Sequence, residues 1–429
     1  VGRDDDNEQL ISYKAQADDD WQESSFKFEG GDVYPLSFTQ DNQGVYFVAN
    51  VGDGTRGLFL YNLKSKSAKK LVHNSKVDIS NMLWDFSKRR IIGVGTDLGL
   101  PDYQYIDAKD AKTLLHHNLR VTFKDKDVVI TSASKDTTKT IVYVYSDSDP
   151  GSYYLFDSKK VELRWLISKR QWIDPKLMAK TQSVTVKTRD DTIIRGYLTL
   201  PNGKDKGLPM VVVPHGGPHG IRDFWGFDWE VQLLASRGYA VLQMNYRGSG
   251  GFGEAFEEAG KGNWGTLMQD DLTDATKAMI ATGVADVKRI CLYGTSYGGY
   301  AALMGVVKEP DLYRCAIGSA GVYNLPMMFK LGDIAQRSSG LAYLKEVLGE
   351  NNEDLKSRSP VFNVKKIKAQ VMLIHGAQDE RAPIEQAQSL MSAMDEIGKS
   401  YQFIEMDDEA HGYYDESNRL SVGGAGFFG

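Results

Sequence analysis

The sequence has few cysteines, no long apolar run and no large excess of charge. Only two of its 429 residues are cysteine, which excludes a small scaffold held together by many disulfides. No run approaches the ~20 apolar residues that a membrane-spanning helix needs. The net charge of -6 offers no basic surface to nucleic acid or to an anionic membrane. The composition is therefore that of a globular chain, long enough for more than one domain.

Two further observations concern the start of the chain and its thiols. The chain begins at Val1 without an initiator Met or a signal-peptide pattern. We therefore expect that it derives from a longer precursor, and its cellular compartment stays open. Cys291 and Cys315 lie in apolar, strand-like runs. This setting favours buried free thiols over a disulfide.

Residues 1–172 have an all-β pattern. Short runs rich in Tyr, Phe, Val and Ile alternate with turn residues. Groups of such runs begin at 35–38, 81–86 and 118–123. Their separation of about 40–45 residues is typical of four-stranded propeller blades. We expect an incomplete β-propeller of three to four blades, with His116 and His117 on its surface.

After a linker at 173–182, strands alternate with helices over residues 183–429. This order predicts a mostly parallel, doubly wound sheet whose ligands bind beyond the carboxyl ends of the strands. Helices are expected at 229–236, 267–281 and 384–397, with helical pieces within 323–348. Strands are expected at 184–187, 193–200, 210–213, 240–245, 289–293, 315–319, 371–374 and 401–406.

Residues 294–298 fit the pattern G-x-S-x-G, with Ser296 at its centre. A strand-like run precedes them and a helix-forming run follows. Glycine permits the tight turn between the two, which would hold the serine hydroxyl beside a helix N-terminus. The pattern predicts that Ser296 is a nucleophile.

Two partners follow Ser296 in the chain. Asp379 and His411 each come shortly after a predicted strand, so both should lie at the same sheet edge as Ser296. The order Ser, Asp, His is the one expected of α/β-hydrolases. An imidazole must take the serine proton, and a carboxylate must orient that imidazole. Asp408 and Asp415 are alternatives to Asp379.

An oxyanion hole needs two N–H donors near the serine. We expect Tyr297, directly after the nucleophile, and Gly217, in the loop after the strand at 210–213. His215 and His219 flank this loop, but no third ligand is evident nearby, so we expect no metal.

A second glycine pattern, G-x-G-x-x-G at 248–253, also follows a strand. A dinucleotide site would need an acidic residue at the end of a second strand. Asp270 and Asp271 lie at the right distance but inside a predicted helix. We therefore expect no cofactor.

Five stretches together resemble the prolyl oligopeptidase family of serine peptidases, in the branch of the acylaminoacyl peptidases. They lie at 215–218, 245–251, 294–300, 375–383 and 409–412. The resemblance implies Ser296, Asp379 and His411 as the triad and a propeller that controls access to them. It also implies an apolar substrate pocket at Val322, Leu325 and Met328.

The chain differs from this family in two respects. Fewer blades are visible than the family's seven or eight, and a glycine-rich tail at 421–429 stands where the family has a final helix. We expect that tail not to form a stable helix.

The sequence favours a serine peptidase that cleaves short peptides after an apolar residue, acylaminoacyl- or dipeptidyl-peptidase-like. A carboxylesterase is the alternative enzyme, because it shares the elbow and the triad. A propeller interaction module with an inactive hydrolase domain is the non-enzymatic alternative, which the presence of all three triad residues disfavours. Small peptides are the expected partners, and the oligomeric state stays open.

Overall fold

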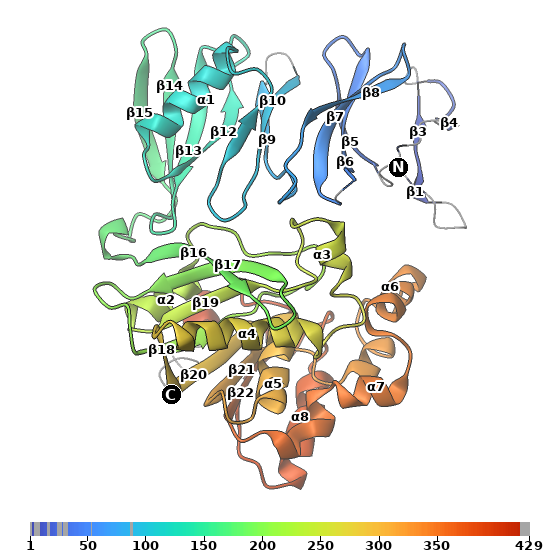
Figure 1. Cartoon of the computed structure of the whole chain (residues 1–429), viewed down its shortest axis with the longest axis vertical. Coiled ribbons are helices and arrows are strands. Elements are labelled where there is room, and N and C mark those ends of the chain that lie inside the picture. Colours follow the sequence, from blue (N-terminus) through green and yellow to red (C-terminus); the bar gives the residue numbers. More distant parts are fainter. Residues whose placement is uncertain are drawn as a thin grey trace.

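The computed structural model describes residues 2–3, 9–14, 18–23, 28, 33–52, 54–85 and 89–420. The tail at 421–429 therefore lies outside the described residues. A β half stands above an α/β half, and the chain passes between them once, near residue 170 (Figure 1). Within the described part of the chain, no helix has both the length and the apolar character needed to cross a membrane.

Three antiparallel sheets follow one another in the β half. The first has the order β5-β6-β7-β8, the second β11-β10-β9 and the third β12-β13-β14-β15. The predicted starts of the first two groups are confirmed. Four two-residue strands precede these sheets: β1 (Gly2–Arg3), β2 (Gln9–Leu10), β3 (Ser12–Tyr13) and β4 (Gln22–Glu23). The three sheets comprise β5 (Val33–Phe38), β6 (Gly44–Asn50), β7 (Arg56–Asn62), β8 (Ser67–Val72), β9 (Met82–Asp85), β10 (Arg90–Gly95), β11 (Tyr103–Tyr105), β12 (Asp127–Ala133), β13 (Lys139–Tyr145), β14 (Ser152–Asp157) and β15 (Glu162–Ser168).

The expected strand at 118–123 is wrong, because residues 118–122 belong to helix α1 (Ala111–Thr122) and Phe123 is its C-cap. Asp110 caps the helix by accepting hydrogen bonds from the N–H groups of Lys112 and Thr113. Leu115 and Leu119 are one helical turn apart and pack against the third sheet. The predicted surface position of His116 is also wrong. Its ring is fully buried, and Nε2 lies 2.9 Å from the Val128 carbonyl oxygen.

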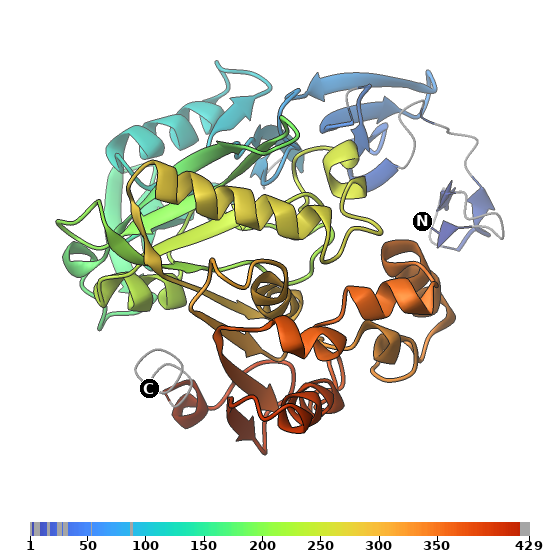
Figure 2. The same ribbon diagram turned by 60° about the horizontal axis from the view of Figure 1, so that its bottom comes forward.

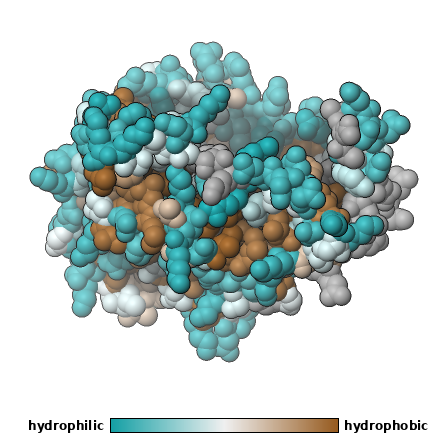
Figure 3. Space-filling view, turned by 90° about the horizontal axis from the view of Figure 1, so that it is seen from above, coloured by the Kyte–Doolittle hydropathy of each residue, from teal (hydrophilic) through white to brown (hydrophobic). Residues whose placement is uncertain are grey.

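The surface of the β half is partly apolar. Seen from above, apolar patches lie between hydrophilic rims (Figure 3). At the first sheet, alternate residues of β5 remain well exposed: Tyr34 by 45%, Leu36 by 39% and Phe38 by 42%.

The α/β half is built on one eight-stranded sheet of order β16-β17-β19-β18-β20-β21-β22-β23. Strands β16, β17 and β19 pair antiparallel, and every neighbouring pair from β19 to β23 is parallel. Helices cover both faces of the sheet (Figure 2). The predicted fold class, an α/β-hydrolase after an incomplete propeller, is confirmed.

Five predicted elements have the predicted bounds: β17 (Ile193–Leu200), α2 (Trp229–Ser236), β19 (Ala240–Asn245), α4 (Leu267–Ala281) and β21 (Cys315–Ser319). The other strands are β16 (Lys180–Lys187), β18 (Leu208–Val212), β20 (Ala285–Thr295), β22 (Gln370–Gly376) and β23 (Gln402–Met406). The other helices are α3 (Glu254–Glu258), α5 (Tyr297–Lys308), α6 (Ser338–Leu348), α7 (Asn352–Ser357) and α8 (Glu385–Glu396), with 3-10 turns at Pro175–Leu177, Leu325–Phe329 and Pro360–Lys366.

The expectation of free thiols is wrong, because Cys291 and Cys315 form a disulfide. Their 24-residue separation conceals that β20 and β21 are neighbours in the sheet. The parallel register sets the two cysteines directly opposite each other, with their Cα atoms 4.7 Å apart. This distance lies within the range that a disulfide can bridge.

Candidate active site

Ser296 lies at the turn between β20 and α5. Its backbone has φ +61° and ψ -122°, a conformation that residues with a side chain rarely adopt. Gly298 makes the turn possible, because a Cβ there would lie 2.2 Å from the Pro214 carbonyl oxygen. The nucleophile turn thus packs directly against the loop that follows β18.

Ser296, His411 and Asp379 form one chain of hydrogen bonds. His411 Nε2 lies 3.1 Å from Ser296 Oγ, and His411 Nδ1 lies 2.7 Å from Asp379 Oδ2. With the proton on Nδ1, the ring donates to the carboxylate and accepts from the hydroxyl. This is the geometry in which an imidazole takes a serine proton while a carboxylate fixes its tautomer.

The other oxygen of Asp379 is held by the backbone. Oδ1 accepts hydrogen bonds from the N–H groups of Arg381, at 2.9 Å, and Ala382, at 2.8 Å. The buried His375 lies nearby, with Nε2 2.7 Å from the Ala382 carbonyl oxygen. Both lone-pair sides of the carboxylate are therefore occupied, and Oδ2 faces His411.

The loop that carries His411 is closed by a carboxylate that sequence reasoning missed. Glu409 accepts hydrogen bonds from the N–H groups of Tyr414 and Asp415, and the Tyr414 N–H holds the pKa of Glu409 below its usual range. Asp415 accepts from the Ser417 N–H instead of from His411, and Asp408 is exposed. The structure thus places Asp379 against His411. Neither Asp408 nor Asp415 takes this position. The Glu-Ala-His-Gly run was the available signal for Glu409.

Gly217 and Tyr297 are the two predicted oxyanion donors, and Tyr297 directly follows the serine. Gly217 is exposed, has φ +112° and follows Gly216, where an added Cβ would lie 3.5 Å from Ser296 Cβ. Tyr297 is the first residue of α5, so its N–H has no acceptor within the helix. Two backbone N–H groups beside a serine hydroxyl can stabilise a developing oxyanion.

His215 and His219 do not face a common point. His215 Nε2 lies 2.8 Å from Ser249 Oγ, whereas His219 Nε2 accepts a hydrogen bond from Trp264 Nε1 at 3.2 Å. Burial lowers the pKa of each ring to about 4, so both stay neutral near pH 7. Across the described ranges, no group of three or more His, Cys, Asp or Glu side chains is placed to hold a metal ion.

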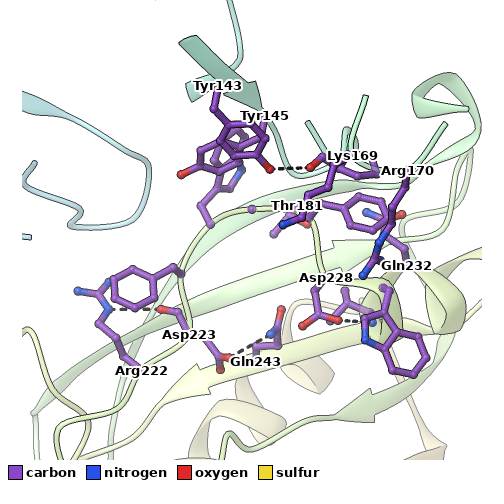
Figure 4. Close-up of a pocket in the computed structure, with 17 residues that line it drawn as sticks. Tyr143, Tyr145, Lys169, Arg170, Thr181, Arg222, Asp223, Asp228, Gln232 and Gln243 are labelled. Atoms are coloured by element: carbon purple, nitrogen blue, oxygen red, sulfur yellow. Dashed lines mark hydrogen bonds between the residues drawn. The ribbon is translucent and has the colours of Figure 1, made fainter. Parts of the chain in front are cut away.

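The three predicted pocket residues lie in the main apolar core. Val322 is 6%, Leu325 0% and Met328 9% exposed, and they share this core with residues of α5. A cavity of about 420 Å³ lies elsewhere, beside residues 222–228 of the loop after β18 (Figure 4). Tyr145 and Lys169 of the β half also line it, and none of the three triad candidates does.

Comparison with known proteins gives a family for most of the α/β half. Residues 225–422 match the model of the prolyl oligopeptidase family, a family of serine-type peptidases. These residues form a prolyl oligopeptidase family domain. The match includes Ser296, Asp379 and His411, and the resemblance inferred from the sequence is confirmed.

Relatives of this prolyl oligopeptidase family domain include two curated enzymes. Dipeptidyl aminopeptidase BIII of Pseudoxanthomonas mexicana is 30% identical over 393 residues, which cover 88% of this chain and 56% of that enzyme. The acylamino-acid-releasing enzyme of Mus musculus is 32% identical over 193 residues, or 43% of this chain and 26% of that enzyme. This chain therefore spans about half of the first relative's length, and less of the second.

A solved structure extends the likeness to the β half. The puromycin-hydrolyzing peptidase of Mycobacterium tuberculosis superposes with a TM-score of 0.74 over 93% of this chain and 61% of that one. At 19% sequence identity, this likeness shows the fold alone.

Proposed function

We propose that this protein is a serine peptidase that hydrolyses short peptides through an acyl-enzyme. The hydrogen-bonded chain from Ser296 through His411 to Asp379 carries the proposal. Ser296 Oγ attacks the peptide carbonyl carbon while its proton passes to His411 Nε2. That proton then goes to the leaving amine as the C–N bond breaks. A water molecule then attacks the acyl-enzyme carbonyl carbon and gives a proton to His411 Nε2. His411 returns this proton to Ser296 Oγ as the ester bond breaks, which releases the acid and restores the serine.

Charge would develop on the carbonyl oxygen during each attack. We assign its stabilisation to the N–H groups of Gly217 and Tyr297, because Tyr297 directly follows Ser296 and Gly217 follows Gly216, which lies beside Ser296. Removing one such donor in a serine peptidase typically costs ~10²–10³-fold in turnover. Asp379 holds the imidazole tautomer. Its negative charge should therefore matter more for turnover than the size of its side chain.

The substrate preference is proposed to be an apolar residue before the scissile bond. Val322, Leu325 and Met328 carry no charge, so a charged substrate side chain placed against them would lose its hydration without gaining a partner. The names of the relatives favour short peptides with a free or an acylated amino terminus. Folded proteins should be poor substrates, because the β half stands above the α/β half (Figure 1).

The nucleophile and its orienting carboxylate are tested by two substitutions. Ser296→Ala should abolish labelling by a fluorophosphonate probe together with peptide hydrolysis. Asp379→Asn should fold normally yet lose ~10⁴-fold in turnover, because the imidazole tautomer is no longer fixed. The matched controls are Ser236→Ala and Asp408→Asn, at exposed positions. Labelling of the Ser296→Ala variant would refute the assignment, and a loss below about tenfold for Asp379→Asn would point to another carboxylate.

A substrate panel tests the reaction class. It compares free and blocked aminoacyl and dipeptidyl arylamides, a short-chain nitrophenyl ester and a folded protein, with the full-length protein as enzyme. Arylamides with Leu or Phe should react fastest. Faster turnover of Lys or Asp would remove the pocket assignment. Ester hydrolysis without amide hydrolysis would make the protein a carboxylesterase.

A further inference from the structure

Two loops separate the β half from Ser296. The oxyanion loop, residues 213–228, follows β18 and carries Gly217. The glycine loop, residues 246–253, follows β19 and contains the G-x-G-x-x-G run that the proposed reaction does not use. Each loop contacts the other along part of its length.

The glycine loop packs closely against the oxyanion loop. The Gly250 N–H donates to the Ile221 carbonyl oxygen at 3.0 Å, and Tyr246 Oη donates to the His215 carbonyl oxygen at 2.7 Å. A Cβ on Gly250 would lie 2.6 Å from the Gly220 carbonyl oxygen. Only glycine therefore allows the two backbones to approach this closely.

The other side of the glycine loop touches the β half. The Asp78 N–H donates to the Gly251 carbonyl oxygen at 2.9 Å. Just past the loop, the Glu254 N–H donates to the Gly54 carbonyl oxygen at 2.9 Å, and Asn50 Nδ2 donates to Glu254 Oε2 at 2.8 Å. The β half, the glycine loop and the oxyanion loop thus form three successive layers.

Arg222 joins the outer layers directly. Its guanidinium lies over the rings of Phe224, at 4.7 Å, and Phe252, at 4.2 Å, one from each loop. Nη2 donates to the Asp97 carbonyl oxygen of the β half at 3.0 Å. In the close-up, Arg222 stands at the end of the cavity wall that the oxyanion loop forms (Figure 4). A Cβ on Gly251 would lie 2.8 Å from Nη1, so the glycine loop also leaves room for this side chain.

We propose that Arg222 and the glycine loop are positioning elements that make the geometry of the oxyanion hole depend on docking of the β half. The inference rests on the proposed function. Arg222 touches no reacting group, and it acts through the backbone that leads to Gly217. A displacement of about 1 Å at such a site can cost ~10²-fold in rate, so small shifts of this layer suffice. The glycine run therefore has a mechanical role in this proposal.

Two variants test the proposal, each with a matched control. Gly250→Ala pushes against the Gly220 backbone, whereas Gly52→Ala adds a methyl where nothing lies within 4 Å. Arg222→Ala removes the link to Asp97, whereas Arg164→Ala removes an exposed arginine of β15. Gly250→Ala and Arg222→Ala should lower kcat by about 10- to 100-fold with KM nearly unchanged, because oxyanion contacts are made mainly in the transition state. Both controls should keep wild-type kcat.

A second readout separates positioning from simple destabilisation. A peptide aldehyde forms a hemiacetal with the serine, so its inhibition constant should rise in parallel with the loss of kcat/KM. Millimolar guanidinium should restore part of the activity of Arg222→Ala and none of that of Gly250→Ala. If Gly250→Ala fails to fold, the comparison of Arg222→Ala with its control Arg164→Ala tests the proposal alone.

The outcomes distinguish the two proposals. Unchanged kcat in folded Arg222→Ala would overturn the positioning role, and so would a rise in KM at constant kcat. A wild-type protein that neither reacts with a fluorophosphonate nor cleaves any arylamide would instead overturn the proposed function.

Discussion

At the scale of single residues, the candidate site contains a strained backbone conformation and a carboxyl group shielded from water. The surrounding structure holds both in place. Ser296 holds a positive φ. Asp223, in the loop after β18, is half-buried, and its carboxyl oxygen Oδ2 is shielded from water. Its Oδ1 accepts from Gln243 Nε2 at 3.2 Å, while no hydrogen-bond partner for Oδ2 is found among the described residues. Burial raises the pKa of Asp223 to about 7.

This raised pKa predicts a pH-dependent stability. Between the unfolded value of 3.8 and about 7, the folded chain retains a proton at Asp223 that the unfolded chain releases. The contribution of Asp223 to stability is therefore complete at low pH and is lost as the pH rises through about 7. Relative to Asp223→Asn, the wild-type free energy of unfolding should fall across this window and level off above it. Urea unfolding over a pH series measures this difference, and a constant difference would contradict it.

At the scale of elements, neighbouring strands bring together residues that are distant in the chain. The ends of β20, β22 and β23 lead to Ser296, Asp379 and His411, and the same order places Cys291 opposite Cys315. Glycines at the ends of these strands allow close packing. A Cβ on Gly376, at the end of β22, would lie 2.4 Å from the carbonyl oxygens of Glu409 and Ala410.

The disulfide between β20 and β21 gives an element-scale prediction. Denatured, unreduced protein should contain no free thiol, and reduced protein should contain two. The double variant Cys291→Ala/Cys315→Ala should lose about 3 kcal/mol of unfolding free energy, the entropy cost expected for a cross-link of this loop length. Thiol titration and urea unfolding measure the two effects. The reference is wild-type protein in reductant, which should be about as unstable as the variant. Free thiols in the unreduced protein would contradict the pairing.

At the scale of the whole molecule, the two halves are joined by polar contacts on both sides of the glycine loop. On the side of the chain crossing, the buried Gln232 of α2 donates to the carbonyl oxygens of Asp147, at 3.0 Å, and Ala179, at 2.9 Å. It also accepts from the Ala179 N–H at 2.8 Å. One amide thus ties α2 to the chain crossing and to the β half.

Replacing this amide should loosen the junction. Gln232→Ala leaves buried backbone groups without partners, which costs about 1–3 kcal/mol for each group left unsatisfied. We expect faster trypsin cleavage after Lys169, Arg170 or Lys176, which lie at the crossing. Timed digestion followed by mass spectrometry measures the rate at each bond. The control is Gln388→Ala, at an exposed position of α8. Equal cleavage rates in the two variants would show that Gln232 does not hold the halves together.

The sequence by itself determined the fold class, the bounds of several elements and the residues most suited to the site. These features depend on local signals: hydrophobic periodicity, the glycine turn around Ser296, and loops that leave predicted strands. It misassigned residues 118–123, because the alternation of Leu119, Val121 and Phe123 with polar residues is too short to distinguish a strand from a helix. The tertiary structure decided what depends on strand order and loop contact, including the disulfide, the burial of His116 and the place of the glycine run. No local pattern encodes which strands become neighbours, so the pairing of Cys291 with Cys315 and the layer between the β half and Gly217 emerge only from the assembled sheet.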